Sequence, residues 1–199
     1  MKYIALFLLV FCTVPLSAQG NEEVVFDRVT IQGGFGGPII EMTSIDDQAG
    51  VLFGGGGGVI LNNFFIGGFG QGSGFAEHPI DDRIYSIQLA YGGLWMGYGT
   101  PNNKAIHFFS SLKIGGGSVN IPGDDNDNPL FEENIFVVQP EIGVEINLLK
   151  WCRLAFTADY RVVGGIQSSQ LAGLSNSDFD SPGGTLTLRF GTFSRNRKE

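Results

Sequence analysis

The segment HFFSS, residues 107–111, contains the two residue types from which a hydrolase builds a nucleophile and its base. Catalysis requires the serine and the imidazole within hydrogen-bond reach, with an acid that orients the imidazole. His107 and Ser111 share one face of a strand, but four residues of strand separate them by about 13 Å. We therefore interpret His107 as an interior or rim residue of a protein that is not an enzyme.

Two other segments invite a binding interpretation. The acidic segment GDDNDNP, residues 123–129, is similar to a calcium loop, but counting from Asp124 it lacks the glycine of position six and has Ile135 in place of the final glutamate. The glycine runs contain neither GxGxxG nor a Gly-Lys pair, so they predict no phosphate-binding loop. We expect no metal site and no cofactor, and we interpret the acidic segment as a solvated loop. In the surrounding loop, residues 120–134, the side chains that would contact cations or a basic surface are Asp124, Asp125, Asp127, Glu132 and Glu133.

A third group of polar residues follows a strict alternation. In EIGVEINLLKWCRLAFTADYR, residues 141–161, a polar side chain stands at nearly every second position, which is the period of a strand. Glu141 and Glu145 therefore share one strand face, and Ile142 and Val144 share the other. The pattern breaks briefly and resumes from Arg153. These residues form two strands with one apolar and one charged face.

The same analysis predicts eight strands along the chain. They span residues 29–42, 50–61, 64–75, 83–98, 105–119, 135–148, 152–163 and 183–193. Most are longer than the usual five or six residues, and their length suits a tilted strand that crosses a membrane. Short turns at 62–63, 99–104 and 149–150 alternate with longer loops at 43–49, 76–82, 120–134 and 164–182. This alternation is typical of an up-and-down transmembrane barrel.

Three features predict that the charged face points inward. Aromatic residues fall near strand ends, where membrane interfaces place them; they are Tyr85, Trp95, Tyr98, Trp151 and Tyr160. Glycines concentrate between residues 29 and 75, and a wall without side chains leaves room inside a narrow barrel. A closed barrel also pairs every backbone group in lipid. We expect a charged network in the lumen, formed by Lys113, Glu141, Glu145, Arg153, Asp159, Arg161 and Arg189.

Composition and the two ends of the chain complete the prediction. The net charge of -8 and the acidic pI argue against a nucleic-acid partner. Residues 1–20 have the charged start, apolar core and small final residues of a signal peptide. We expect an all-β, eight-stranded antiparallel up-and-down transmembrane barrel over residues 21–193, and a basic periplasmic tail over residues 194–199.

Taken together, the signal peptide, the alternating strands, the short Asn-rich turns and segments such as GVILNNFFIGGFGQG resemble the small OmpA/OmpX-type outer-membrane barrels of Gram-negative bacteria. The chain departs from them at its end, where SRNRKE follows Phe193 in place of a terminal aromatic residue. The resemblance implies an outer-membrane monomer in contact with lipid, lipopolysaccharide and the barrel assembly machinery. It implies a structural or surface-interaction role, with any binding in loops 120–134 and 164–182. A narrow pore, a carrier of a small apolar ligand and a lipid A-modifying enzyme are the alternatives.

Overall fold

The computed structural model describes residues 30–45, 48–80, 83–100, 104–122, 129–167 and 174–193. The predicted signal peptide, the tail 194–199 and the loop residues Asp124, Asp125 and Asp127 lie outside these ranges. No helix within these ranges is long and apolar enough to cross a membrane.

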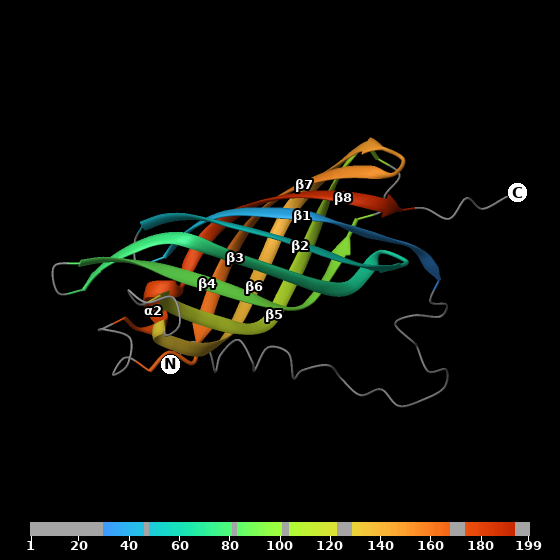
Figure 1. Ribbon diagram of the computed structural model, residues 1–199. Helices are drawn as coiled ribbons and strands as arrows, with labels where there is room; N and C mark the ends of the chain where they lie inside the picture. The colour runs from blue at the N-terminus through green and yellow to red at the C-terminus, as the bar shows by residue number, and fades with distance from the viewer. Residues whose placement is uncertain are drawn as a thin grey trace, which may run out of the picture.

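Eight antiparallel strands form one closed barrel (Figure 1). They are β1 (Ile31–Ile45), β2 (Gln48–Leu61), β3 (Phe64–Ile80), β4 (Arg83–Gly99), β5 (Ile106–Pro122), β6 (Pro129–Leu149), β7 (Cys152–Gly164) and β8 (Ser181–Thr192), with the short helix α2 (Asn176–Phe179) before β8. Each strand pairs with the next, and β1 closes the barrel on β8 from Gly34↔Thr192 to Met42↔Gly184. β1 begins and β8 ends at the end of the barrel that carries the short turns, on the right in Figure 1. The predicted eight-stranded, up-and-down antiparallel barrel is confirmed.

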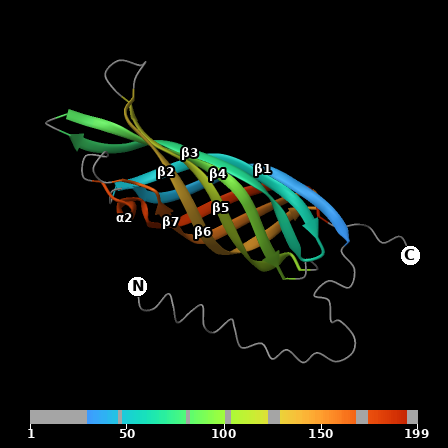
Figure 2. The ribbon, with the colours of Figure 1, turned by 90° about the horizontal axis from the view of Figure 1, so that it is seen from below.

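Several strands extend beyond their predicted ends on the loop side. β3 continues to Ile80, β5 continues to Pro122, and β6 already begins at Pro129. The predicted loop 120–134 therefore shrinks to residues 123–128, because its flanks continue to pair with each other as far as Ile121↔Phe131 and Pro122↔Pro129. The two hairpins β3–β4 and β5–β6 project beyond the rest of the barrel (Figure 2).

The two faces of the barrel wall have opposite chemistry. Large apolar side chains on the outside include Met42, Phe108, Phe136, Ile142 and Phe156, and charged side chains on the inside are buried. A protein in water would hide the apolar face and hydrate the charged one. The arrangement observed here is the inverse, and it suits a hydrocarbon solvent.

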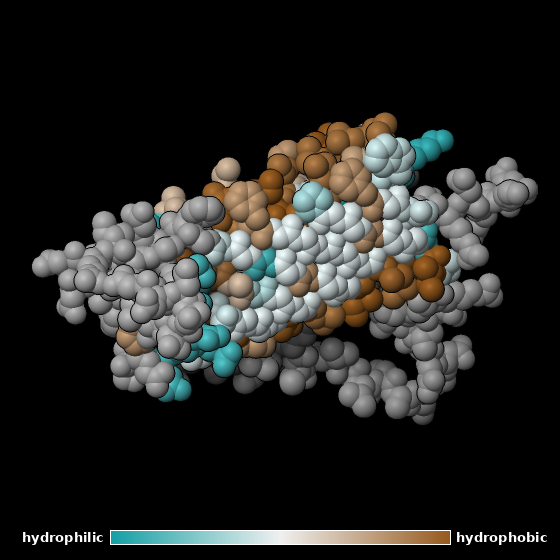
Figure 3. Space-filling model, in the orientation of Figure 1, coloured by the Kyte–Doolittle hydropathy of each residue, from teal (hydrophilic) through white to brown (hydrophobic). Residues whose placement is uncertain are grey.

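Glycine gives part of the outer surface a flat profile. On β1, β2 and β3 the outward positions include Gly36, Gly57 and Gly68, which lie side by side because Gly36 pairs with Gly57 and Gly57 with Gly68. Figure 3 shows this region as a pale surface between brown apolar bands. The bulky apolar contacts of the barrel are therefore distributed unevenly around its circumference.

The loop end of the lumen contains an apolar core. Leu52, Leu89, Val119 and Val137 point inward from four strands and are fully buried. Phe179 of α2 packs into the same cluster and is also fully buried. The segment before β8 therefore folds into the mouth of the barrel and forms part of its core.

Candidate functional site

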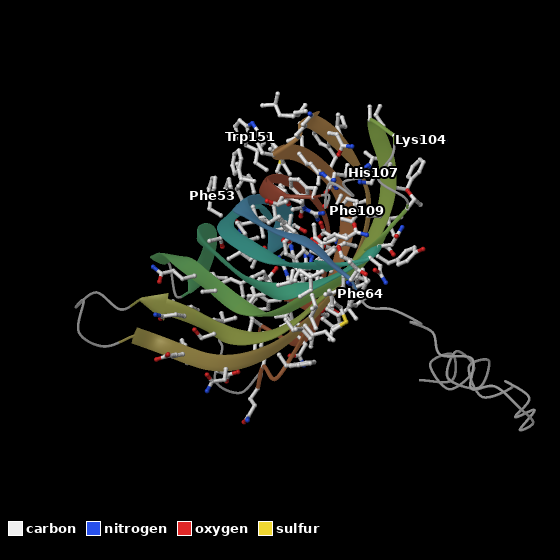
Figure 4. The ribbon with its side chains drawn as sticks, turned by 90° about the vertical axis from the view of Figure 1, so that its right-hand side faces the viewer. Phe53, Phe64, Lys104, His107, Phe109 and Trp151 are labelled. Atoms are coloured by element: carbon white, nitrogen blue, oxygen red, sulfur yellow. The ribbon has the colours of Figure 1, made fainter. Side chains whose placement is uncertain are left out.

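Between the apolar core and the turn end, the lumen contains three polar layers. The first layer lies at the turn end. Glu145 of β6 accepts hydrogen bonds from Arg153 Nη1 at 2.6 Å and from Arg189 Nη1 at 2.6 Å, and its Oε1 lies 2.9 Å from His107 Nε2. The Arg153 guanidinium stacks 3.8 Å from the ring centre of Phe193. Figure 4 looks into this end and shows His107 on the inner side of β5.

The second layer is centred on Glu141. Its carboxylate lies 2.8 Å from Lys113 Nζ and accepts hydrogen bonds from Ser111 Oγ and from Trp95 Nε1, the latter at 3.1 Å. The Lys113 ammonium also lies 5.4 Å from the ring centre of Phe69, within the range of a cation–π contact. Glu141 and Lys113 are thus paired charges whose remaining contacts are polar or aromatic.

The third layer, closer to the loop end, joins charged and neutral polar groups. Gln139 Nε2 donates to Glu41 Oε2 at 2.9 Å and to Asp159 Oδ1 at 2.8 Å. Arg161 Nη1 lies 3.4 Å from Glu41 Oε1, and its Nε donates to the backbone carbonyl of Phe179 at 3.0 Å. Arg161 therefore ties the polar layer to the helix that fills the mouth.

These layers close the lumen in its middle. Lys113, Gln139 and Arg161 have 0% of their surface exposed, so no water-sized space touches them. An eight-stranded barrel is narrow enough for side chains to fill. The described lumen therefore contains a packed, hydrogen-bonded interior at this level.

All seven side chains expected in the lumen network are buried there and share ion pairs or hydrogen bonds. The third layer is completed by four residues that the predicted network did not include, Glu41, Gln71, Tyr91 and Gln139. Glu41 can be predicted from the alternation of side chains along a strand, because it shares the inward face of β1 with Phe35 and Ile39. The other three residues are neutral, and the network was predicted from charged residues alone.

The interfacial aromatics divide into three groups. Tyr98, Trp151 and Tyr160 point outward and are about half exposed. Trp95 was wrongly predicted to be interfacial: it is 1% exposed, faces the lumen and packs edge-on against Phe65 at 5.2 Å. Trp95 and Tyr98 are three positions apart, an odd number, so a strand directs them to opposite faces. The side chain of Tyr85 lies outside the described residues.

The loop prediction also needs correction. Three apolar residues of the predicted binding loop 164–182, Ile166, Leu174 and Phe179, are buried in the mouth of the barrel and do not face a partner. Burial there removes their apolar surface from water, and this state is lower in free energy than one that leaves the same side chains exposed to solvent. Glu133 is buried too and accepts a hydrogen bond from the Gln167 backbone N–H at 2.7 Å. Glu132 remains exposed on β6.

The possible catalytic pair, His107 and Ser111, is not bonded to each other, because each side chain bonds to a different carboxylate. His107 bonds to Glu145 in the first layer, and Ser111 donates to Glu141 in the second. A hydrolytic serine needs the imidazole itself as its base. Among the described residues no group of three or more His, Cys, Asp or Glu side chains is placed to hold a metal ion.

Among the described residues, no strand pairs with the outer backbone edges of the projecting hairpins. Pairing of β3 with β4 extends to Ile80↔Arg83, but pairing of β2 with β3 stops at Phe53↔Gly72. On the other hairpin, β6 pairs with β7 only from Phe136 onward. We call residues 73–80 with 83–87 the first ribbon, and residues 121–122 with 129–135 the second ribbon.

Comparison with known proteins bears on the fold. No family profile and no curated protein matches the sequence. The crystal structure of Neisserial surface protein A is similar with a TM-score of 0.58 and 11% identity, over 84% of this chain and 99% of that one. The attachment invasion locus protein Ail of Yersinia pestis, in complex with the heparin analogue sucrose octasulfate, gives a TM-score of 0.48 and 12% identity, over 81% of this chain and 98% of that one. By its closed eight-stranded topology, and by its likeness to the Neisserial protein, this chain has the fold of the small outer-membrane β-barrels.

Proposed function

We propose that the protein is an integral outer-membrane barrel that acts at the cell surface without catalysis, by presenting its two ribbons to a partner. The observation that carries the proposal is the pair of ribbons at the end opposite the chain termini (Figure 2). With the termini in the periplasm, this end faces outward. The proposal also takes residues 1–20 as a cleaved signal peptide and residues 194–199 as a periplasmic tail.

The chemistry of a strand edge indicates the kind of partner. An unpaired edge presents a row of N–H and C=O groups that an extended segment of another protein can extend as an added strand. The second ribbon also has the exposed Glu132, and the sequence between its strands contains Asp124, Asp125 and Asp127. A partner with an extended, basic segment fits both features. Divalent cations that bridge this acidic tip to lipopolysaccharide phosphates are compatible with the same position.

The interior supports this function over the alternatives. A pore needs a continuous water path, whereas the middle of the lumen is occupied by Lys113, Gln139 and Arg161 without exposed surface. A lipid-modifying hydrolase needs His107 and Ser111 bonded to each other, and each is bonded to a different carboxylate. We therefore assign recognition to the ribbons, and to the lumen network the role of holding the barrel closed. Lipid, lipopolysaccharide and the assembly machinery are its expected contacts, and the barrel acts as a monomer.

The test is an adhesion assay with cells that display the barrel. Residues 74–86, residues 121–131, or both are replaced with a short Gly-Ser link, and residues 168–173 are replaced in the matched control, which keeps both ribbons. We expect adhesion to fall when a ribbon is shortened and to persist in the control. Outer-membrane fractionation and the electrophoretic shift between heated and unheated samples verify that each barrel is inserted and folded. Adhesion that persists without either ribbon would contradict the proposal.

A further inference from the structure

The outer wall of the barrel contains a groove on the half that carries the short turns. Its volume is about 610 Å³, which lies within the roughly 300 to 1,000 Å³ of pockets that hold drug-sized ligands. Strands β4 to β7 form it, and its outward side chains include Tyr98, Phe108, Ser110, Ile142, Phe156 and Ala158. The groove therefore belongs to the surface that meets the bilayer, apart from the lumen network and from the ribbons.

Alternating side-chain sizes give the groove its shape. Its walls are four large, exposed side chains, those of Tyr98, Phe108, Ile142 and Phe156. The register places Ser110 between Tyr98 and Ile142, and it places Val144 between the two phenylalanines. These walls stand two strands apart, about 10 Å between backbones, and their own side chains occupy part of that width. The floor has room for one hydrocarbon chain, but not for a helix about 10 to 12 Å across.

The groove changes from polar to apolar along its length. Its polar end lies at Tyr98 and Thr100, where β4 ends and a short turn begins. Ser110 pairs with Tyr98, and its hydroxyl group has no hydrogen-bond partner in the part of the chain that the structure describes. At the other end, Phe156 and Ala158 lie in the interior of β7. An occupant must therefore be polar toward the turns and apolar beyond them.

A lysine marks the polar end of the groove. Lys104 is exposed in the turn that joins the groove residues Thr100 and Phe108, at the turn end of the barrel (Figure 4). Its backbone carbonyl accepts a hydrogen bond from Asn147 Nδ2 at 2.9 Å, which holds the turn against β6. The described residues of the short turns include two lysines, Lys104 and Lys150, and no carboxylate. Charge complementarity therefore favours an anionic group at this end.

We propose that the groove binds one anionic phospholipid of the periplasmic leaflet, with an acyl chain against Val144 and Ala158 and the phosphate beside Lys104. The Lys104 ammonium donates to the phosphate, and the Ser110 hydroxyl donates to an ester carbonyl of the lipid. A lysine close to the membrane surface attracts anionic lipids. The turn end faces the periplasm in the orientation proposed above, so the lipid of that leaflet reaches the groove, whereas lipopolysaccharide lies in the opposite leaflet.

The first experiment compares two headgroups on the same acyl chains. The barrel, purified from outer membranes into zwitterionic detergent, is mixed with phosphatidylglycerol or with phosphatidylcholine, and native mass spectrometry counts the lipids that each barrel retains. We expect one phosphatidylglycerol per barrel at saturation, with an affinity about fivefold or more above that of phosphatidylcholine, because one lysine lies beside the headgroup. Equal affinity for both lipids, or uptake without saturation, would overturn the proposal. Adhesion through the ribbons is measured separately, so either result can fail without the other.

Two substitutions of the same kind locate the acyl chain. Ala158→Phe fills the groove, and we expect the affinity for phosphatidylglycerol to fall roughly tenfold or more, because the chain loses apolar contact. Ala90→Phe is the matched control, since it adds the same ring at an exposed position of β4 outside the groove. If Ala158→Phe fails to show the electrophoretic shift of a folded barrel, Ser110→Leu replaces it and fills the groove from β5. Equal losses in the groove variant and the control would contradict the assignment.

A second pair of substitutions locates the headgroup. Lys104→Gln leaves the groove open, so we expect phosphatidylcholine to bind as before and the preference for phosphatidylglycerol to disappear. Lys150→Gln is the matched control, because this exposed lysine belongs to another short turn and does not line the groove. A preference that survives Lys104→Gln, or that disappears in Lys150→Gln, would overturn the position of the phosphate. A barrel dimer that phosphatidylglycerol does not dissociate and that Ala158→Phe abolishes would assign the groove to a second copy of the chain instead.

Discussion

At the scale of single residues, Glu145 is the carboxylate on which the turn end of the lumen depends. It bridges two guanidinium groups that come from different strands, β7 and β8. Both pairs are buried, so neither cation can recover its hydration if the carboxylate is removed. The energetic role of Glu145 is therefore larger than that of a carboxylate on the surface.

We predict that Glu145→Gln lowers the free energy of unfolding by about 3 to 5 kcal/mol, because it leaves two buried cations without their acid. Equilibrium unfolding in urea, in detergent or lipid vesicles, measures this change. Glu132→Gln is the control, since Glu132 is exposed on the same strand, and its effect should stay within about 0.5 kcal/mol. Similar costs for both variants would show that Glu145 is not an essential bridge.

Glycine 97 gives a second prediction at this scale. A methyl group at Gly97 would collide with the ring of Phe65, its paired neighbour on β3, and with the backbone carbonyl of Ser110. Gly97→Ala should therefore cost about 1 to 3 kcal/mol of unfolding free energy through overpacking. Gly70→Ala is the matched control, because no atom lies within 4 Å of the added methyl, and we expect it to be neutral or slightly stabilising. Equal destabilisation would contradict the packing role of Gly97.

Much of the site can be predicted from whether a residue stands at an odd or an even position of its strand, because this decides which face its side chain joins. The errors arise where this rule was not applied. Charged residues on β6 and β7 alternate so regularly that their inward face can be predicted from the sequence. Trp95 was assigned by its nearness to a turn, although it shares a face with the inward Tyr91 and not with Tyr98. Which neutral side chains complete a layer depends on strand register, which local sequence does not specify.

At the scale of elements, α2 is a single turn that stabilises the mouth of the barrel. Ser175 caps it, with its backbone N–H donating to Asp178 at 2.6 Å, and Arg161 holds the carbonyl of Phe179. An isolated turn of helix is unstable in water, so tertiary packing must hold it. Segment 164–182 was predicted to be a loop because its Ser, Gly and Asn content is typical of loops, whereas its burial depends on contacts with distant strands.

We predict that Phe179→Ala lowers the free energy of unfolding by about 3 to 5 kcal/mol, because it leaves a cavity among fully buried neighbours. Residues 174–182 should also become sensitive to protease in the folded barrel. Urea unfolding and limited proteolysis measure the two effects. Ser177→Ala, an exposed change in the same helix, should alter neither. Unchanged protection in Phe179→Ala would show that α2 does not depend on this anchor.

At the scale of the whole molecule, the apolar exterior predicts that the cost of a charged side chain on the outer face depends on its depth in the bilayer. Ile142 lies within β6 and is 68% exposed, and Ile106 is the first residue of β5 and is 57% exposed. In a bilayer, Ile142→Arg should cost about 2 to 4 kcal/mol, and Ile106→Arg about 0 to 1. Unfolding from lipid vesicles measures both changes. Equal costs would mean that the outer face does not meet a bilayer as assigned.

The packed lumen predicts the electrical behaviour of the barrel. Reconstituted in planar bilayers, the protein should show little or no steady conductance, because fully buried side chains occupy the middle of the interior. Bilayers without protein provide the baseline. Large and stable channels would require the polar layers to separate, and would restore the pore as the leading function.

The seam between β1 and β8 constrains how the chain folds. It pairs Phe35 with Gly191, so closing it brings opposite ends of the sequence together, and ordering such distant segments is slow. Until β8 is present, β1 and β7 each have an open edge, which favours aggregation. Removal of the last strand therefore destroys two interfaces at once. Truncation from the C-terminal side should lead to all-or-none loss of the native state, even though the truncated chain still contains the sequences of the other seven strands.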